Sequence, residues 1–344
     1  MAGGSGKRFW PLSRSKNPKQ LLNLSGRMPL VCEAFEHLRS TILPENIFIV
    51  TNIKYRKKII KAFNYKFPPN NIICEPASRN TSACILYALL KIKHMFGDGT
   101  IVIMPADLYI GEDKLFHEDL LKALNRLEYT KDIITFGILP TFPATGYGYI
   151  KYVNSRQEVK KVEKFIEKPK YEEALRYYKS GEYFWNSGIF VSNIFSLIGE
   201  YENFLPSMYK QFFKIDKYIN SRKEYSHLSK IYPFLEIIPI DKGIIEKSLN
   251  VKMIVASFTW DDVGSWEKLK TYHLEDEFGN LFLSNNLHVD TKNVITYSKD
   301  MMIITLGVKD IVVAEYDRAI LVCHKSRTQE VGELVEKITE KKYL

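Results

Sequence analysis

Short apolar runs alternate with helical patterns over the first part of the chain. The runs are typical of buried strands and lie at residues 47–51, 72–75, 100–105 and 133–138. Between them, apolar residues recur at three- and four-residue spacing, which predicts helices over residues 54–67, 80–96 and 112–129. This β-α-β-α order predicts an α/β fold, in which helices cover both faces of a mixed, mostly parallel sheet. The run at 100–105 is apolar enough for a strand covered on both faces.

The pattern changes from about Gly148 onward. A hairpin and then a helix are predicted at residues 149–153, 159–167 and 171–179. After Gly279 short apolar pieces recur between polar breaks, which predicts a small β domain of solenoid-like form that ends in a helix over 330–341. We therefore expect a large domain at residues 1–278 and a small one at 279–344.

Charge narrows the classes of partner. The 344 residues carry a net charge of +9, which is compatible with nucleic acid or with small anionic substrates. The lysines are spread along the chain, and no RRM, KH or helix-turn-helix signature occurs. A solvated lysine-rich surface is the favoured interpretation, and no nucleic-acid partner is expected.

Cysteine spacing and hydropathy narrow the picture further. The four cysteines form no CxxC pair, which favours buried thiols over structural zinc. No apolar run is long enough to span a bilayer, and the first residues lack the apolar core of a signal peptide. We expect a cytoplasmic protein with no membrane partner.

A glycine-rich stretch lies at the start of the sequence. Glycines let backbone N–H groups approach a phosphate, so a nucleotide-binding loop is predicted at Ala2, Gly3, Gly4, Ser5, Gly6 and Lys7. The stretch matches neither the Walker A pattern nor GxGxxG. Arg8 and Lys19 add two cations that can neutralise a triphosphate. The alternative is a surface turn with solvated charges.

Seven motifs follow one another in order along the chain. They are GGSGKR with PKQ at 3–8 and 18–20, EPASRNT at 75–81, MPAD at 104–107, TGYGYI at 145–150, FIEKP at 165–169, WNSGIF at 185–190 and WDDVGSW at 260–266. The ordered set resembles the sugar nucleotidyltransferase family, and within it the bacterial mannose-1-phosphate guanylyltransferases, or GDP-mannose pyrophosphorylases. The resemblance covers essentially the whole chain. It implies a Rossmann-like, GT-A-like nucleotidyltransferase domain with a short β-helix-like appendage.

Two aspartates are candidate metal ligands. Asp107 follows the strand predicted at 100–105, and the carboxyl ends of parallel strands are where α/β sheets bind ligands. Asp262 lies in a tryptophan-flanked turn, 155 residues later. The resemblance assigns both to Mg²⁺, which takes carboxylate, phosphate and water oxygens. From the residues alone, a turn or a helix N-cap is the alternative for Asp107.

The resemblance also implies contacts to the nucleotide at Glu75, Arg79, Asn80, Thr81 and Pro105. Guanine presents two neighbouring N–H donors, and the Glu75 carboxylate can accept both. An exposed carboxylate at a strand end is the alternative. Arg79 and Asn80 precede a predicted helix, where they orient the nucleotide or where Asn80 merely caps the helix.

Contacts to the sugar phosphate are implied at Tyr147, Gly148, Glu167, Lys168 and Asn186. A carboxylate accepts hydrogen bonds from sugar hydroxyls, and a lysine holds a phosphate as a point charge. Gly148 lets the backbone approach the sugar, and Asn186 offers both a donor and an acceptor. The alternative for Glu167 and Lys168 is a plain surface ion pair.

The reaction implied by the resemblance is transfer of GMP from GTP to α-D-mannose 1-phosphate. Arg8, Lys19, Asp107 and Asp262 are the expected catalytic residues, with Mg²⁺ as cofactor. Two rivals remain: transfer to another sugar 1-phosphate such as a manno-heptose, and a non-catalytic subunit that senses GDP-mannose. The β domain is expected to leave no room for a phosphomannose isomerase domain, and a homodimer is compatible with the sequence.

One departure from the family concerns the first residues. In the family, a short apolar strand precedes the glycine-rich loop, whereas this sequence reads Met1-Ala2-Gly3. A sheet without that strand leaves neighbouring backbone groups unpaired. We therefore expect the chain to be less stable than a version extended by several apolar residues.

Overall fold

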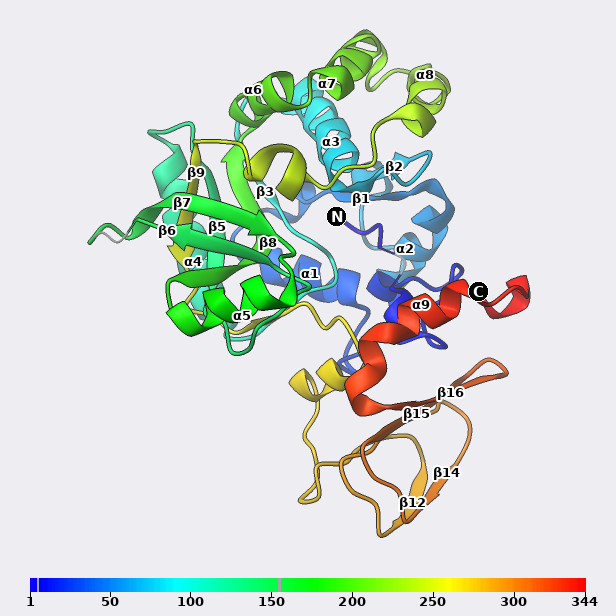
Figure 1. Ribbon diagram of the computed structural model, residues 1–344. Helices are drawn as coiled ribbons and strands as arrows, with labels where there is room; N and C mark the ends of the chain where they lie inside the picture. Colours follow the sequence, from blue (N-terminus) through cyan, green and yellow to red (C-terminus); the bar gives the residue numbers. More distant parts are fainter. Residues whose placement is uncertain (5, 154–155) are drawn as a thin grey trace.

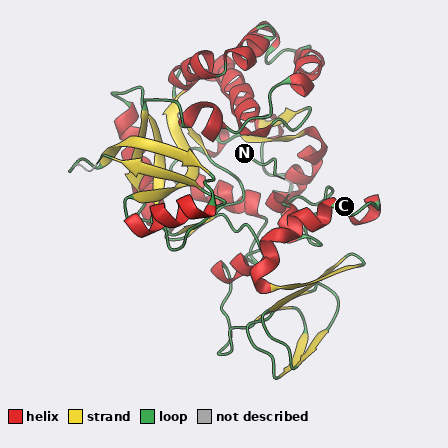
Figure 2. Ribbon diagram, viewed as in Figure 1, coloured by secondary structure: helices red, strands yellow, loops and turns green. Residues whose placement is uncertain are grey.

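The computed structural model describes residues 1–4, 6–153 and 156–344. Helices and strands build a large domain, and a smaller β domain lies below it in the view of Figure 1, where the C-terminal helix packs between them. Figure 2 shows the same separation, with most of the helix in the upper part and with strands and loops dominating the lower part. Among the described residues, no helix is long and apolar enough to cross a membrane.

A six-stranded sheet forms the centre of the large domain, in the order β3-β8-β5-β9-β7-β6. Its strands are β3 Thr100–Ile103, β5 Ile133–Ile138, β6 Gly148–Tyr152, β7 Val159–Glu167, β8 Tyr183–Asn193 and β9 Val251–Val255. Strands β5 and β9 are parallel, while β8 runs antiparallel between β3 and β5. The sheet is mixed, as expected, but the prediction of mostly parallel pairing is wrong for these strands. Strands β3 and β5 run in the same direction, but the long strand β8 lies between them and pairs antiparallel with both.

Two small ladders complete the strands of the large domain. Strand β1, Ile49–Asn52, pairs in parallel with β2, Ile72–Glu75. Strand β4, Tyr109–Ile110, pairs antiparallel with β10, Trp260–Asp261. The second ladder matters for the site, because it holds together two chain segments that are about 150 residues apart and that each carry a predicted metal ligand.

The helices of the large domain are α1 Leu30–Arg39, α2 Arg56–Ala62, α3 Asn80–Phe96, α4 Asp113–Leu127, α5 Tyr171–Ser180, α6 Ile194–Phe204, α7 Pro206–Phe213 and α8 Glu224–Ile231. Helix α3 has the predicted length. Helix α2 ends earlier than predicted, because Asn64 and Tyr65 adopt positive φ angles of 50° and 62°, which end a right-handed helix.

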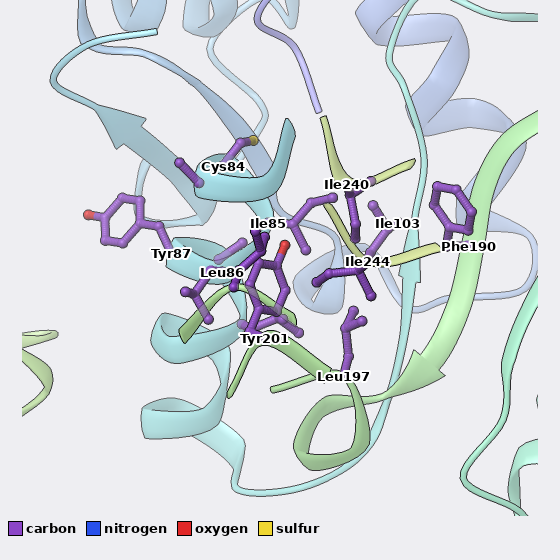
Figure 3. Close-up of a cluster of buried hydrophobic side chains, with 14 of the residues drawn as sticks. Cys84, Ile85, Leu86, Tyr87, Ile103, Phe190, Leu197, Tyr201, Ile240 and Ile244 are labelled. Atoms are coloured by element: carbon purple, nitrogen blue, oxygen red, sulfur yellow. The ribbon is translucent and has the colours of Figure 1, made fainter. Parts of the chain in front are cut away.

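Helix α3 lies at the centre of one hydrophobic cluster. Its residues Ile85 and Leu86 face Leu197 and Tyr201 of α6, and Ile244 closes the cluster from a later turn (Figure 3). All five side chains are buried. This packing fixes the segment around Ile244 against the start of α3, which places two parts of the candidate site side by side.

The small domain has the predicted solenoid-like form. Its elements are β11 Leu281–Leu283, β12 Asn286–Val289, β13 Ile295–Tyr297, β14 Ile303–Leu306, β15 Ile311–Tyr316, β16 Ala319–His324 and α9 Val331–Glu336. Strands β11, β13 and β15 stack in parallel, as do β12 and β14, and β16 ends the stack antiparallel to β15. Helix α9 is shorter than the predicted 330–341, because the chain turns after Glu336 and packs Ile338 onto the domain interface.

The small domain packs directly on the glycine-rich loop. The buried guanidinium of Arg14 donates to the carbonyls of Tyr316, Asp317 and Lys342, at 2.7, 2.9 and 3.1 Å. The Trp10 indole N–H donates to the carbonyl of Tyr343 at 2.8 Å. The first residues of the chain are therefore positioned by the last ones.

A cavity of about 380 Å³ lies between β1, β3 and α3 and is lined mainly by apolar side chains, including Phe48, Val50, Ile92 and Ile101. Strand β3 lies at the edge of its sheet beside this cavity, and most of it is half-buried or exposed. The expectation of a strand covered on both faces at 100–105 is therefore wrong. The cavity lies at this edge of the sheet, where no strand of the described residues pairs with β3 on the side away from β8.

The two N-terminal residues lie at the end of this cavity. The backbone N–H of Ala2 donates to the carbonyl of Val50 at 2.7 Å, and the Met1 ammonium donates to the carbonyl of Met104 at 2.7 Å. Burial lowers the pKa of that ammonium. Residues added before Met1 in an extended conformation would run between β1 and β3.

Extension by about five β-forming apolar residues before Met1 should raise Tm by roughly 5 °C or more. The added segment would fill the cavity, pair with strand edges and move the ammonium out of the interior. The check is calorimetric melting of both chains, with a glycine-serine extension of equal length as control. Equal melting temperatures for the unextended and apolar-extended chains would contradict the expectation.

Candidate active site

The glycine-rich loop is anchored at both ends. The carbonyl of Ala2 accepts from the Thr51 hydroxyl at 2.7 Å and from the Gln20 amide at 2.9 Å. Gly6 has φ 62°, and a Cβ there would lie 2.4 Å from the Cβ of Lys19. Only glycine therefore fits the position, which lets the loop lie close to Lys19. Ser5 lies outside the described residues.

Lys19 joins the loop to both candidate metal ligands. Its buried ammonium donates to the carboxylate Oδ2 and the carbonyl of Asp107, at 3.0 and 3.1 Å. It also donates to the carbonyl of Asp262 at 2.6 Å. Asp107 follows β3 and Asp262 follows β10, and the ladder between β4 and β10 brings these segments together. One cation thus satisfies oxygens from two distant parts of the chain.

The Asp262 carboxylate has further partners. Its Oδ1 accepts from the Tyr147 hydroxyl at 2.7 Å and from the backbone N–H of Gly264 at 3.1 Å. A Cβ on Gly264 would lie 2.7 Å from Asp262 Oδ2 and 3.1 Å from an Arg8 guanidinium nitrogen. Burial, and then the charge of Asp262, raises the pKa of Tyr147, so this hydroxyl remains a donor at neutral pH. Tyr147 was predicted to contact the sugar phosphate. In the structure its hydroxyl instead donates to the carboxylate of Asp262, in the turn that lies near Arg8.

Lys19 thus binds the Asp107 carboxylate and the Asp262 backbone, and Arg8 lies close to the turn at Asp262 and Gly264. Asp107 and Asp262 offer oxygen ligands, the type that a hard divalent cation takes along with phosphates and waters. No group of three or more His, Cys, Asp or Glu that could hold a metal occurs in the part of the chain that the structure describes. A divalent cation held by these two carboxylates would need further oxygen ligands, such as those of phosphates and waters. The carboxylate of the neighbouring Asp261 accepts from the Lys268 ammonium at 2.8 Å and from the backbone N–H of Val263 at 2.7 Å.

The motif at residues 75–81, which is predicted to contact the nucleotide, begins beside Gly3 of the loop. Glu75, at the end of β2, is only 5% exposed and accepts a hydrogen bond from the Tyr232 hydroxyl. Its second oxygen lies 3.9 Å from where a Cβ on Gly3 would be. Burial raises the pKa of Glu75 to about 6, while the Tyr232 hydrogen bond opposes that rise. The carboxylate is thus a buried group behind the loop, and its predicted contact with guanine stays a prediction.

The start of α3 is tied to later segments. The Arg79 guanidinium donates to the carbonyls of Tyr232 and Pro233. Asn80 is the first helical residue, with φ 63°, and its side chain accepts from the N–H of Thr81. The Thr81 hydroxyl accepts from the N–H of Ile240 at 2.8 Å. The predicted cap at Asn80 is therefore displaced by one residue, because Arg79 holds the N-cap position.

The residues predicted to contact the sugar phosphate form a second polar cluster on or next to β6, β7 and β8. We call this cluster the sugar motif; it comprises Gly148, Glu167, Lys168 and Asn186. Glu167 pairs with Lys168 at 3.1 Å. A Cβ on Gly148 would lie 2.7 Å from Glu167 Oε2 and 3.3 Å from the Cβ of Asn186, so Gly148 lies close to both side chains. Elsewhere in the site, Pro105 lies 3.5 Å from where a Cβ on Gly188 would be. The predicted sugar-phosphate residues, apart from Tyr147, are therefore brought together.

Several residues of the site were not predicted from the sequence. Asp241 accepts from the Asn186 amide at 2.9 Å, and the Thr135 hydroxyl donates to the Asn186 carbonyl oxygen at 2.9 Å. Glu246 accepts from the backbone N–H of Glu167 at 2.7 Å. One signal was available for Asp241, since a lone acidic residue interrupts the apolar stretch 237–245.

Comparisons with known proteins identify the family of both parts of the chain. The Nucleotidyl transferase family profile matches residues 1–277, and the profile of the MannoseP isomerase/GMP-like beta-helix domain matches residues 284–338. The Xanthan biosynthesis protein XanB of Xanthomonas campestris pv. campestris (strain B100) is 33% identical over 98% of this chain and 72% of its own length. A mannose-1-phosphate guanylyltransferase of Klebsiella pneumoniae is 30% identical over 98% of this chain and 72% of its own length.

A solved structure extends the likeness to three dimensions. The crystal structure described as mannose-1-phosphate geranyltransferase from Thermus thermophilus superposes with a TM-score of 0.87 at 30% identity. The match covers 98% of this chain and 97% of that one. The fold and its two parts are therefore shared over nearly the whole length.

The buried carboxyl of Glu75 makes stability depend on pH. Its pKa of about 6 exceeds the ordinary 4.5, so the folded state binds more protons than the unfolded state between these values. The protonated Glu75 therefore contributes to the free energy of unfolding below pH 4.5, and this contribution is lost as the pH rises through 6. Glu75→Gln keeps an acceptor for Tyr232 but does not titrate, so it should gain about 2 kcal/mol relative to wild type between pH 4 and pH 8.

The measurement is urea unfolding of both proteins across this pH range. Glu236→Gln is the matched control, because Glu236 is exposed and its replacement removes the same charge. Its free energy of unfolding should run parallel to that of wild type. Parallel curves for Glu75→Gln as well would show that the Glu75 pKa is not raised.

Proposed function

Since the chain belongs to the nucleotidyl transferase family, we propose that it transfers GMP from GTP to α-D-mannose 1-phosphate, releasing diphosphate and GDP-mannose. The observation that carries the proposal is the meeting of the loop, Asp107 and Asp262 at the ammonium of Lys19. Relatives named mannose-1-phosphate guanylyltransferase over 98% of this chain support the choice of base and sugar.

The residues supply positioning and charge neutralisation. The attacking group is the phosphate of the sugar, which is already anionic at neutral pH, so no general base is needed. Arg8 would neutralise charge on the triphosphate and on the leaving diphosphate, and Lys168 would hold the sugar phosphate. Lys19 would contribute its positive charge without a direct hydrogen bond, since its three N–H groups already donate to Asp107 and Asp262. Glu167 and Asn186 would orient the sugar hydroxyls, and Glu75 would read the guanine edge.

We propose Mg²⁺ as the cofactor, with Asp107 and Asp262 as its protein ligands. Bound there, the cation would neutralise phosphate charge during transfer. The Tyr147 hydroxyl and the Lys19 ammonium hold these two segments in place before any substrate arrives. We further infer a catalytic domain at residues 1–278 and a β domain at 279–344. We also infer that the enzyme is cytoplasmic, since GTP is abundant in that compartment. The homodimer stays a prediction.

The direct test is diphosphate release from each of the four NTPs in the presence of mannose 1-phosphate and Mg²⁺. Release with GTP alone is expected. Release with another NTP instead would retain the reaction but reject Glu75 as the guanine selector. No release with any NTP would contradict the proposal. Other sugar 1-phosphates would then be tested first, and GDP-mannose binding next, as for a sensing subunit.

Asp107→Ala should lower kcat by at least about 10²–10³-fold, because it removes a carboxylate ligand of the proposed Mg²⁺, which would neutralise charge on the reacting phosphates. Steady-state kinetics with GTP and mannose 1-phosphate measure the effect. Asp300→Ala is the control, since Asp300 is exposed in the β domain and its loss changes the net charge equally. Unchanged kcat in the Asp107 variant would exclude this carboxylate from the site.

A further inference from the structure

Asp241 holds a fixed position at the edge of the sugar motif. It begins a π-helical turn, Asp241–Ile245, in which Ile244 is buried, as is the preceding Ile240, in the cluster around α3 (Figure 3). A Cβ on Gly243 would lie 3.0 Å from Leu205, so the turn also packs tightly against that residue. The backbone of the turn is therefore held on several sides, while Asp241 itself remains half-buried.

The orientation of Asn186 is set by the same contacts. The Thr135 hydroxyl and the backbone N–H of Gly188 both donate to the Asn186 side-chain oxygen, at 2.9 and 3.2 Å. The amide nitrogen must then face Asp241, to which it donates at 2.9 Å. Asp241 is thus connected to β5 and β8 through a fixed amide, and it lies inside the group predicted to bind the sugar.

The Asp241 and Glu167 carboxylates lie near enough for the charge of Glu167 to act on Asp241. Burial, followed by the charge of Glu167, raises the pKa of Asp241 to about 7. Lys168 is paired with one oxygen of Glu167. The charges that face Asp241 are those of Glu167 and Lys168. A part of a ligand that brings O–H donors would satisfy the two acids. Neighbouring hydroxyls of a pyranose have this chemistry.

We propose that Asp241 is a specificity-determining residue that accepts a hydrogen bond from a sugar hydroxyl, together with Glu167 and Asn186. The inference rests on the proposed function, since it names a further contact to the same sugar 1-phosphate. Asp241 selects hexoses by the position of their hydroxyls and leaves the nucleotide untouched. A site built to accept from a hydroxyl discriminates strongly against a substrate that lacks it.

The test is steady-state kinetics of Asp241→Asn and Asp241→Ala with mannose 1-phosphate and its 2-, 3- and 4-deoxy analogues. In wild type, one analogue should lose about 10- to 100-fold in kcat/KM, the value of a hydrogen bond to a charged acceptor. Both variants should lose a similar factor with mannose 1-phosphate, and that analogue should cost them little more. KM for GTP should stay unchanged. Glu236→Gln, exposed on the same segment, should behave as wild type.

Three results would overturn the inference. One is an unchanged kcat/KM for mannose 1-phosphate in a folded Asp241→Asn variant. Another is an equal rise in KM for GTP, which would indicate a structural role. The third needs only wild type, so it applies even if the variants fail to fold: no deoxy analogue loses turnover. Failure of the proposed function is a different outcome, because wild type would then release no diphosphate with mannose 1-phosphate itself.

Discussion

The burial of one ammonium group determines the arrangement of the candidate site. Lys19 is 7% exposed, and its charge is compensated by three oxygens from Asp107 and Asp262. Removing one partner of such a buried group costs about 3–5 kcal/mol, because the remaining charge is left without compensation. The loop, the end of β3 and the turn after β10 are therefore held as one unit. The Tyr147 hydroxyl attaches the sugar motif to this unit through Asp262.

Local patterns predicted the elements whose formation depends on local sequence. The strand at 133–138, the hairpin of β6 and β7 and the helix at 80–96 were predicted, because their apolar periodicity is regular. The direction and insertion of β8 were not, since strand order depends on contacts between residues about 50 to 90 positions apart. The end of α2 depends on left-handed residues, which periodicity does not reveal.

The candidate site divides in the same way. The motifs contain the residues that lie around Lys19 and on β6–β8, because each motif keeps its residues close in sequence. Asp241 and Thr135 stand outside every motif, and tertiary packing alone brings them to Asn186. Gln329, which accepts from the Arg8 guanidinium at 2.5 Å, comes from the other domain and had no sequence signal. Residues that contact the site in space but lie far from its motifs along the sequence are the ones that sequence patterns do not reveal.

The contacts between the two ends of the chain have a consequence for synthesis. Trp10 and Arg14 bond to Tyr343 and Lys342, more than 320 residues away. A ribosome that has produced the glycine-rich loop must still make almost the whole protein before these partners emerge. Domains fold largely as they are made, from the N-terminal side. Here the contacts of Trp10 and Arg14 with the last residues form only when the chain is nearly complete, so the segment that follows the glycine-rich loop stays incompletely fixed throughout translation.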